Sequence, residues 1–231
     1  MPFDWQFLTD PRLIAALAAG LRLTVILSVA SAVGALLVGL AVAVVRIAAP
    51  KPLQSAARIY TDIVRNVPLL ITLFFVYFGT TFVFPPSLYP ILRTQHLGEI
   101  VTVLTISLVM GGFVSEVIRQ GVEAVPFGQM EAALACGLPA GNIYRHVVIP
   151  QLLPLILPGL SSEMVNVLKS TTFAMTIGVA DLMWQAQRIE SDTFRGVETM
   201  TAVTAVYFVL SFATITGFRT LERIFQTPKP R

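Results

Sequence analysis

Cysteine and charge are both scarce in this chain. A single cysteine, Cys136, stands among 231 residues, which excludes an internal disulfide and any zinc site built on several cysteines. We therefore interpret this thiol as a small packing residue. Charged residues make up only 13% of the sequence, against about 25% in an average soluble protein. With 55% hydrophobic residues and a mean hydropathy of +0.76, the composition is that of a protein embedded in a lipid bilayer.

Several signatures of catalysis and nucleic-acid binding are also missing. The sequence holds no G-x-x-x-x-G-K-[ST] phosphate loop, so any ATP hydrolysis must reside in another chain. His96 and His146 are isolated, and no G-x-S-x-G motif is present, which argues against an enzyme and against a metal site. The net charge of +3 comes from scattered Lys and Arg, which argues against nucleic acid. We expect a chain that is no enzyme and binds no cofactor itself.

Long apolar runs dominate what remains. Because a helix needs about 20 mostly apolar residues to cross a bilayer, the sequence predicts five transmembrane helices in one all-α membrane domain covering 1–231. They are residues 23–45, 67–84, 100–118, 152–170 with a broken continuation to 187, and 199–218. Ser31, Ala35 and Gly39 recur every four residues on the first span and permit close helix contact. Glu116 and Arg119 lie one turn apart, where they can pair.

The fourth span is predicted to be irregular. Pro150, Pro154 and Pro158 remove three backbone donors, which favours a kinked or late-starting helix. An apolar piece before Lys169 and another after Thr172 are each too short to span comfortably. Such interrupted segments are typical of the broken helices that line transport sites.

The distribution of Lys and Arg predicts the orientation, because basic residues concentrate in cytoplasmic loops. Ten of them fall between the first and second spans, between the third and fourth, or after the fifth: Arg46, Lys51, Arg58, Arg65, Arg119, Arg145, Arg219, Arg223, Lys229 and Arg231. The other side holds five: Arg12, Arg22, Arg93, Arg188 and Arg195, offset by five acidic residues. We expect the N-terminus outside and the C-terminus in the cytoplasm.

A short polar helix is predicted in the second cytoplasmic stretch, between the third and fourth spans, at residues 127–137. Pro126 can begin this helix and Gly137 can end it, while Ala132, Ala133 and Ala135 offer a small-residue surface. Such a helix suits a groove on a cytoplasmic partner. On the Glu-Ala-Ala triplet alone, a solvated connector with Glu131 facing water is the favoured interpretation, and the rest of the stretch changes this balance.

The wider pattern resembles a known family. Glu131, Ala132, Ala133 and Gly137, followed by Val147, Ile149 and Pro150, have the spacing of the EAA loop of ABC importer permeases. The stretches "YTDIVRNVPLLITLFFVYF", "VSEVIRQGVEAVPFGQMEAALACGLPAGNIYRHVVIPQLLPLILPGL" and "VNVLKSTTFAMTIGVADLM" are similar to the polar amino-acid uptake permeases. This resemblance covers the chain from Tyr60 to about Gln187.

The resemblance implies a function and an assembly. In that family the EAA helix is the coupling helix, which fits a cleft of the ATPase subunit; we carry this role to Glu131, Ala132, Ala133 and Gly137. The resemblance also implies the permease fold, a location in the bacterial cytoplasmic (inner) membrane, and a function in the import of polar amino acids. The implied partners are two ATPase subunits that use ATP, a second identical or homologous permease, and an extracytoplasmic binding protein.

The substrate path departs from the family pattern. The chain has Lys169-Ser-Thr-Thr-Phe173 where the family usually has Lys-Asp-Thr-Ser-Leu, and Thr72 where it often has Gln. The path candidates are Glu163, Lys169, Ser170, Thr171, Thr172, Asn66 and Thr72. Asn66 in "RNVPLL" resembles the residue found in family members that transport glutamate, aspartate or a broad range of amino acids.

Two alternatives stay open from the sequence alone. An ion-coupled secondary carrier or channel also tolerates a broken helix and a buried lysine, although it has no use for an EAA loop. Lys169 either binds the substrate carboxylate or pairs with Glu163 or Asp181 to fix the bundle.

Overall fold

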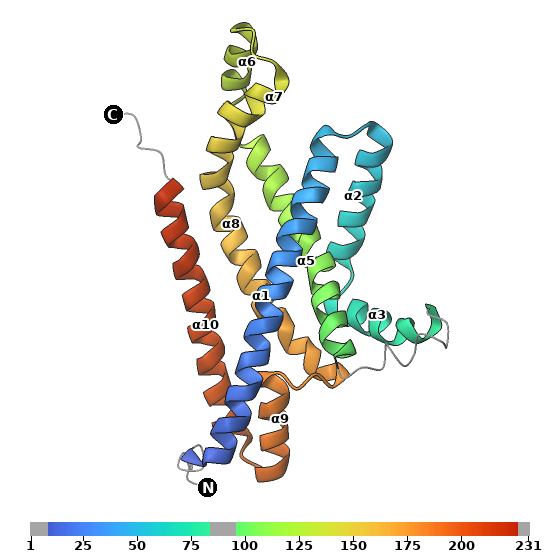
Figure 1. Ribbon diagram of the computed structural model, residues 1–231, viewed down its shortest axis with the longest axis vertical. Coiled ribbons are helices and arrows are strands. Elements are labelled where there is room, and N and C mark those ends of the chain that lie inside the picture. The colour runs from blue at the N-terminus through green and yellow to red at the C-terminus, as the bar shows by residue number, and fades with distance from the viewer. Residues whose placement is uncertain (1–8, 84–95, 226–231) are drawn as a thin grey trace.

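The computed structural model describes residues 9–83 and 96–225, and every regular element in these two ranges is helical. Four helices or helical runs are long and apolar enough to cross a membrane: α1 (Pro11–Ala48), α5 (Leu97–Glu123), the run Gly141–Ile177 and α10 (Gly196–Phe225). They stand side by side in one elongated bundle (Figure 1). A bent pair, α2 and α3, brings the number of possible spans to five in these residues, as predicted.

Helices α1 and α5 form the most extensive contact between any two elements of residues 9–83 and 96–225. The predicted small-residue face of α1 lies in it, because Ser31 and Ala35 are fully buried there. A Cβ added to Gly39 would lie 2.4 Å from Val114 Cγ1, so the backbones approach too closely for any side chain at this position. This prediction is confirmed, and it fixes α1 against α5 as the centre of the fold.

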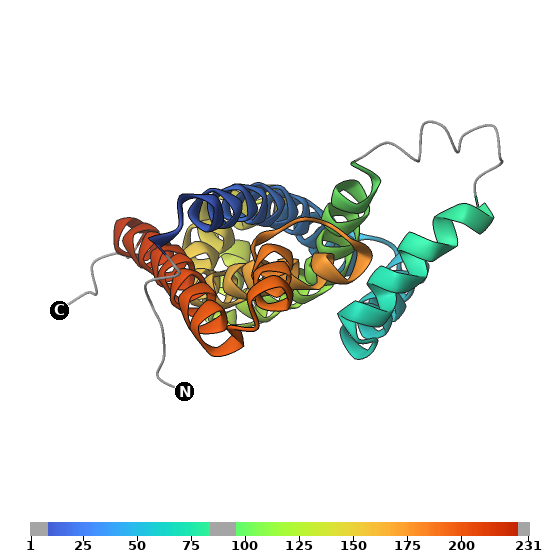
Figure 2. The ribbon, with the colours of Figure 1, turned by 90° about the horizontal axis from the view of Figure 1, so that it is seen from below.

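The second span differs from the single helix predicted at 67–84. Helix α2 (Lys51–Asn66) returns alongside α1 and α5, and α3 (Leu69–Val83) then turns away from it by 104°. The bend falls at Pro68, which lacks an N–H and favours extended backbone at the preceding residue; Val67 has φ −91° and ψ 128°. Arg58 and Arg65 therefore belong to a bundle helix and not to a loop. Figure 2 shows α2 and α3 at one edge of the bundle and α10 at the other.

The fourth span is broken where the sequence predicts it. Helix α8 (Ile149–Ser170) follows the π-helical turn Tyr144–Val148 without a gap and continues through Pro154 and Pro158, so the predicted late start is wrong and the prolines do not interrupt the helix. At Thr171 the chain tightens into the 3₁₀ segment η4 (Thr171–Ile177). After Gly178, with φ +82°, helix α9 (Leu182–Thr193) begins at the N-cap Asp181 and extends beyond the predicted limit of 187.

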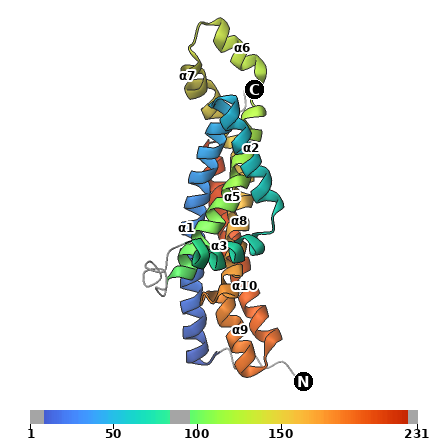
Figure 3. The same cartoon turned by 90° about the vertical axis from the view of Figure 1, so that its right-hand side faces the viewer.

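The predicted short helix lies at one end of the bundle. Helix α6 (Phe127–Ala135), α7 (Ala140–Ile143) and the π-helical turn η3 (Tyr144–Val148) join α5 to α8. The last turns of α1 and α10 lie at this same end, whereas α9 and the start of α1 lie at the opposite end (Figures 1 and 3). Of the basic residues used to predict orientation, Arg93, Lys229 and Arg231 lie outside the described residues, as does the last residue of the predicted span 67–84.

Candidate translocation site and coupling segment

A polar stripe runs along the membrane helix α8. Ser162, Asn166 and Lys169 are spaced four and three residues apart, so they share one face, and all three are exposed in the isolated chain. The Asn166 amide donates a hydrogen bond of 3.3 Å to the Glu163 carboxylate. A lysine facing lipid at this depth costs about 2.5 to 3.5 kcal/mol, so this face must meet water or another polar surface.

Lys169 lacks both of the acidic partners that the sequence offers. In the described ranges, no ion pair joins it to Glu163 or Asp181. Glu163 instead accepts from Asn166, and Asp181 is fully buried as the N-cap of α9, where one carboxylate oxygen accepts from the Trp184 N–H at 2.8 Å. The charge of Lys169 is therefore available to a ligand.

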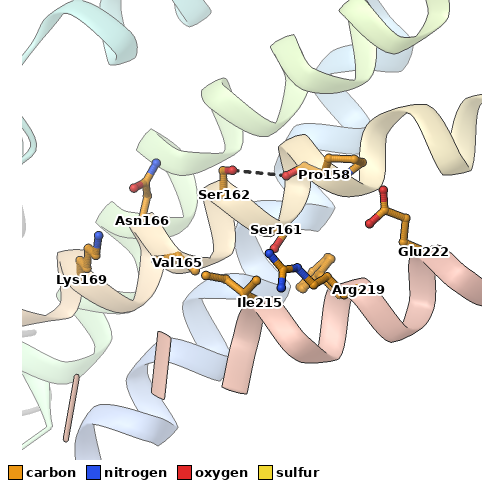
Figure 4. Close-up of a pocket in the computed structure, with 10 residues that line it drawn as sticks. Pro158, Ser161, Ser162, Val165, Asn166, Lys169, Ile215, Arg219 and Glu222 are labelled. Atoms are coloured by element: carbon orange, nitrogen blue, oxygen red, sulfur yellow. Dashed lines mark hydrogen bonds between the residues drawn. The ribbon is translucent and has the colours of Figure 1, made fainter. Parts of the chain in front are cut away.

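Two cavities meet at Asn166 and Lys169. One, of about 470 Å³, lies between α3, α5, α8 and η4 and is lined by Leu69, Met110, Phe113, Glu163, Asn166, Lys169, Ser170, Thr172 and Phe173. The other, of about 410 Å³, lies between α8 and α10, with Ser161, Ser162, Arg219 and Glu222 among its lining residues (Figure 4). The first combines one acidic and one basic side chain with a mainly apolar wall, which suits a small zwitterion.

The structure brings together only part of the predicted substrate path. Glu163, Lys169, Ser170 and Thr172 line the larger cavity. Thr171 is fully buried and its hydroxyl donates to the Leu168 carbonyl at 2.8 Å, so it belongs to the core.

The two candidates on α2 and α3 lie elsewhere. Asn66 donates to the Asp62 carbonyl at the end of α2, and neither Asn66 nor Thr72 is among the residues that line the cavity. Sequence reasoning missed Asn166, although its spacing of three residues from both Glu163 and Lys169 places it on their face.

A partly buried ion cluster ties three helices together next to the larger cavity. The Glu116 carboxylate accepts from Arg119, as predicted, and also from Arg46 of α1 at 2.8 Å; Arg65 of α2 lies 3.9 Å away. The Arg65 guanidinium also covers the ring of Phe113, a cavity residue, at 5.4 Å. The sequence could not indicate the Arg46 and Arg65 contacts, because both residues are predicted to lie in a loop.

The predicted coupling helix ends in a Schellman motif. Gly137 has φ +74°, its N–H donates to the Leu134 carbonyl, and the Leu138 N–H donates to the Ala133 carbonyl. The predicted role of Gly137 in ending this helix is confirmed, although the helix itself is two residues shorter than the range 127–137. A left-handed residue at this position favours glycine strongly.

One face of α6 packs on its own chain and the other is open. Ala133 is buried with Val125, Ile143 and Val148, so it supports the helix and is not part of an outer small-residue surface. Glu131, Ala132, Leu134 and Ala135 are exposed, with Leu134 60% exposed. The side chain of Gln151 on α8 donates to Gln129 of α6 and to the Val147 carbonyl, which fastens α6 to the membrane helix.

Cys136 provides a test of the predicted orientation. The thiol is exposed at the end of α6, so its interpretation as a packing residue is wrong. It lies on the side that we expect to be cytoplasmic. In the absence of an ATPase partner, a membrane-impermeant maleimide is expected to label Cys136 in inside-out vesicles and not in intact cells. A Cys136→Ser chain carrying Thr227→Cys near the C-terminus serves as the control and should label on the same side. Labelling of Cys136 in intact cells would falsify the orientation.

These features define a class. A helical bundle with several membrane spans, an interrupted span bearing a polar stripe beside cavities, and an exposed short helix at one end make this chain a membrane permease. Residues 35–225 match the family model of the binding-protein-dependent transport system inner membrane component, and the chain belongs to that family.

Relatives of known designation cover nearly the whole chain. It is 32% identical over 226 residues to the octopine transport system permease protein OccM of Rhizobium radiobacter, which covers 96% of this chain and 90% of that protein. It is 29% identical to the glutamine transport system permease protein GlnP of Escherichia coli, covering 96% and 98% of the two chains.

Solved structures share the fold. A crystal structure of an amino acid ABC transporter with histidines matches 96% of this chain and 99% of its own, with a TM-score of 0.84 and 30% identity. An inward-facing structure of the MetNI methionine ABC transporter matches 94% and 100% with a TM-score of 0.78; at 18% identity it shows the fold alone.

Proposed function

We propose that this chain is the permease subunit of an ATP-driven importer of polar amino acids in the bacterial cytoplasmic membrane. The observation that carries the proposal is Lys169, an unpaired cation on a spanning helix beside a cavity that Glu163 also lines. The family match and relatives named for octopine and glutamine transport support it. The chain itself contains no phosphate loop, so ATP is hydrolysed by separate subunits.

The proposed assembly contains two copies or homologues of this permease. The polar stripes of their α8 helices would then face a shared path and not lipid, which removes the cost of exposing Lys169. Two ATPase subunits bind the exposed face of α6, and an extracytoplasmic binding protein delivers the amino acid at the opposite end.

The larger cavity suggests how a substrate is held. The Lys169 ammonium attracts the α-carboxylate, while Glu163 attracts the α-ammonium, and Met110, Phe113 and Phe173 exclude water around the remaining side chain. The preference for glutamate, aspartate or a broad range of amino acids is inferred from Asn66, which does not line this cavity. We therefore infer the substrate class, a zwitterionic amino acid, from Glu163 and Lys169 and not from Asn66.

Uptake by the reconstituted complex tests the proposal. Proteoliposomes containing the permeases, the ATPase and the binding protein are expected to accumulate a labelled amino acid when ATP is supplied on the ATPase side, with no ion gradient. Glutamate, glutamine, arginine and octopine as competitors then define the substrate. Uptake that needs an ion gradient and ignores ATP identifies the chain as an ion-coupled carrier and contradicts the proposal.

A further inference from the structure

A buried carboxyl group stands apart from the proposed substrate path. Asp181 lies in the link between η4 and α9, outside the spanning segments, and its side chain is fully buried. Oδ1 accepts from the Trp184 N–H, but Oδ2 has no hydrogen-bond partner in the described part of the chain. An isolated carboxylate is costly to bury, so the second oxygen needs a proton or a partner.

The surroundings of Asp181 come from three further elements and are mostly apolar. Thr24 of α1 accepts the Leu182 N–H at 3.0 Å, and a Cβ added to Gly20 of α1 would lie 2.9 Å from the Asp181 carbonyl oxygen. The first turn of α9 is therefore pressed against α1. Leu182 and Ala186 pack with Val203 of α10 and with Leu17, Leu21, Met183, Met200, Val206 and Tyr207.

Tyr207 of α10 is the titratable group that faces Asp181. Its hydroxyl is within electrostatic reach of the carboxyl and faces Thr24 and Thr171, yet it forms no hydrogen bond of good geometry in the described ranges. Neither α1 nor η4 brings a charged side chain to the site, and no cation lowers the pKa of Asp181. Burial raises the pKa of this carboxyl from 3.8 to about 7.

We propose that Asp181 and Tyr207 form a buried proton-binding site that locks α9 against α1 and α10. A proton taken from solvent forms an O–H bond at Asp181 Oδ2. The Tyr207 hydroxyl, which is not hydrogen-bonded to the carboxyl in this structure, then turns toward it, and its oxygen accepts. Tyr207 then donates its own hydrogen to the hydroxyl of Thr24 or Thr171. One added proton thus removes the buried charge and, once the Tyr207 hydroxyl has turned toward Asp181, gives both unpartnered atoms a partner.

The site lies where its protonation can affect the transport path. Thr172 and Phe173, which line the larger cavity, belong to η4, and only Gly178, Val179 and Ala180 separate the end of η4 from Asp181. Loss of the proton leaves a negative charge in the apolar packing between α9 and α10 and weakens that contact. The external end of the permease would then respond to pH near neutrality.

The sign of the pH dependence follows from the raised pKa. Because the folded protein holds the proton more tightly than the unfolded chain, this stabilisation is fully present below about pH 3.8 and is lost as pH rises through about 7. The melting temperature of the purified complex is expected to fall as the pH is raised from 6 to 8. Asp181→Asn should abolish this dependence on pH. Asparagine keeps the N-cap and, through its amide hydrogens, imitates the neutral acid.

Infrared spectroscopy measures the proton directly. The wild-type complex should show the carbonyl band of a neutral carboxylic acid at pH 6 that disappears with a midpoint about 7. Asp181→Asn should remove this band, whereas Asp192→Asn, the same change on an exposed residue of α9, should leave it. Tyr207→Phe removes the acceptor of the acid proton and should move the midpoint to lower pH.

Three results would overturn the site. A wild-type spectrum without a titrating acid band means that Asp181 is ionised and serves as a helix cap alone. An upward shift in Tyr207→Phe means that Tyr207 donates to an ionised carboxylate. A wild-type pH profile that Asp181→Asn leaves unchanged assigns the titration to another group. The spectrum of the wild-type complex decides the question even where a variant fails to assemble.

Discussion

Ala132→Arg is expected to reduce ATP-driven uptake strongly while leaving the permease inserted in the membrane. Ala132 is exposed on α6, on the side away from the cluster of Ala133 with Val125, Ile143 and Val148. Because Ala132 is exposed, a long charged side chain there can extend into solvent and folding should be unaffected, but the side chain blocks close approach of a partner groove. A loss of at least about tenfold is expected, since 1.4 kcal/mol of lost contact energy suffices. Uptake by proteoliposomes and co-purification with the ATPase measure the effect.

Gly137→Val is expected to give the same phenotype by a different route. An added Cβ meets no atom within 4 Å, so its cost is conformational, because φ +74° is the left-handed region. That region costs an L-residue about 1 to 2 kcal/mol, and a nine-residue helix has little stability with which to absorb it. Misdirection of α6 should release the ATPase.

Two variants control for non-specific damage to this segment. Gly137→Asn should retain part of the uptake, because asparagine tolerates the left-handed conformation. Gly128→Ala places a Cβ in open space in the same helix, without a positive φ, and should behave as wild type. Wild-type uptake and ATPase binding in both Ala132→Arg and Gly137→Val would show that α6 is a connector and not the coupling helix.

Features set by one stretch of sequence could be predicted, and features set by distant contacts could not. The apolar runs give α1, α5 and α10 because a spanning helix needs only length and hydrophobicity. The 3₁₀ break after Ser170 and the left-handed Gly137 follow from local residue chemistry. By contrast, α2 is too polar to predict as a bundle helix by itself, and it is stable there through packing on α1 and α5.

The candidate site also contains some residues that could be predicted from local sequence and others that could not. Glu163 and Lys169 share α8, so their common cavity follows from one helix and its break. Asn66 and Thr72 stand three residues to either side of Leu69, which does line the cavity, but neither of them lines it. The direction of the chain around the bend at Pro68 decides this, and no short-range pattern places that bend in space. The Glu116 cluster joins Arg46, Arg65 and Arg119 across three helices, and only the tertiary packing brings these charges together.

Lys169→Met is expected to cut amino-acid uptake by at least about tenfold while the complex assembles and hydrolyses ATP at its basal rate. Methionine keeps much of the length and apolar stem of lysine and removes only the charge. Because Lys169 is exposed and forms no ion pair in the described residues, its removal leaves no acid unpaired, and assembly should survive. The substrate carboxylate, however, loses the cation that offsets its desolvation in the cavity. Initial uptake rates against substrate concentration measure this loss.

Companion substitutions separate a charge that binds substrate from one that holds the bundle. Lys169→Arg keeps the charge and should retain part of the uptake, because guanidinium also binds carboxylates but fills the cavity differently. Lys51→Met makes the same change at the exposed start of α2 and should leave uptake unchanged. Normal transport by Lys169→Met excludes a role in binding the substrate. If Lys169→Met fails to assemble and Lys169→Arg restores assembly fully, Lys169 serves the packing of the two permeases. A charge that stabilises the assembly is needed whether or not an amino acid is bound.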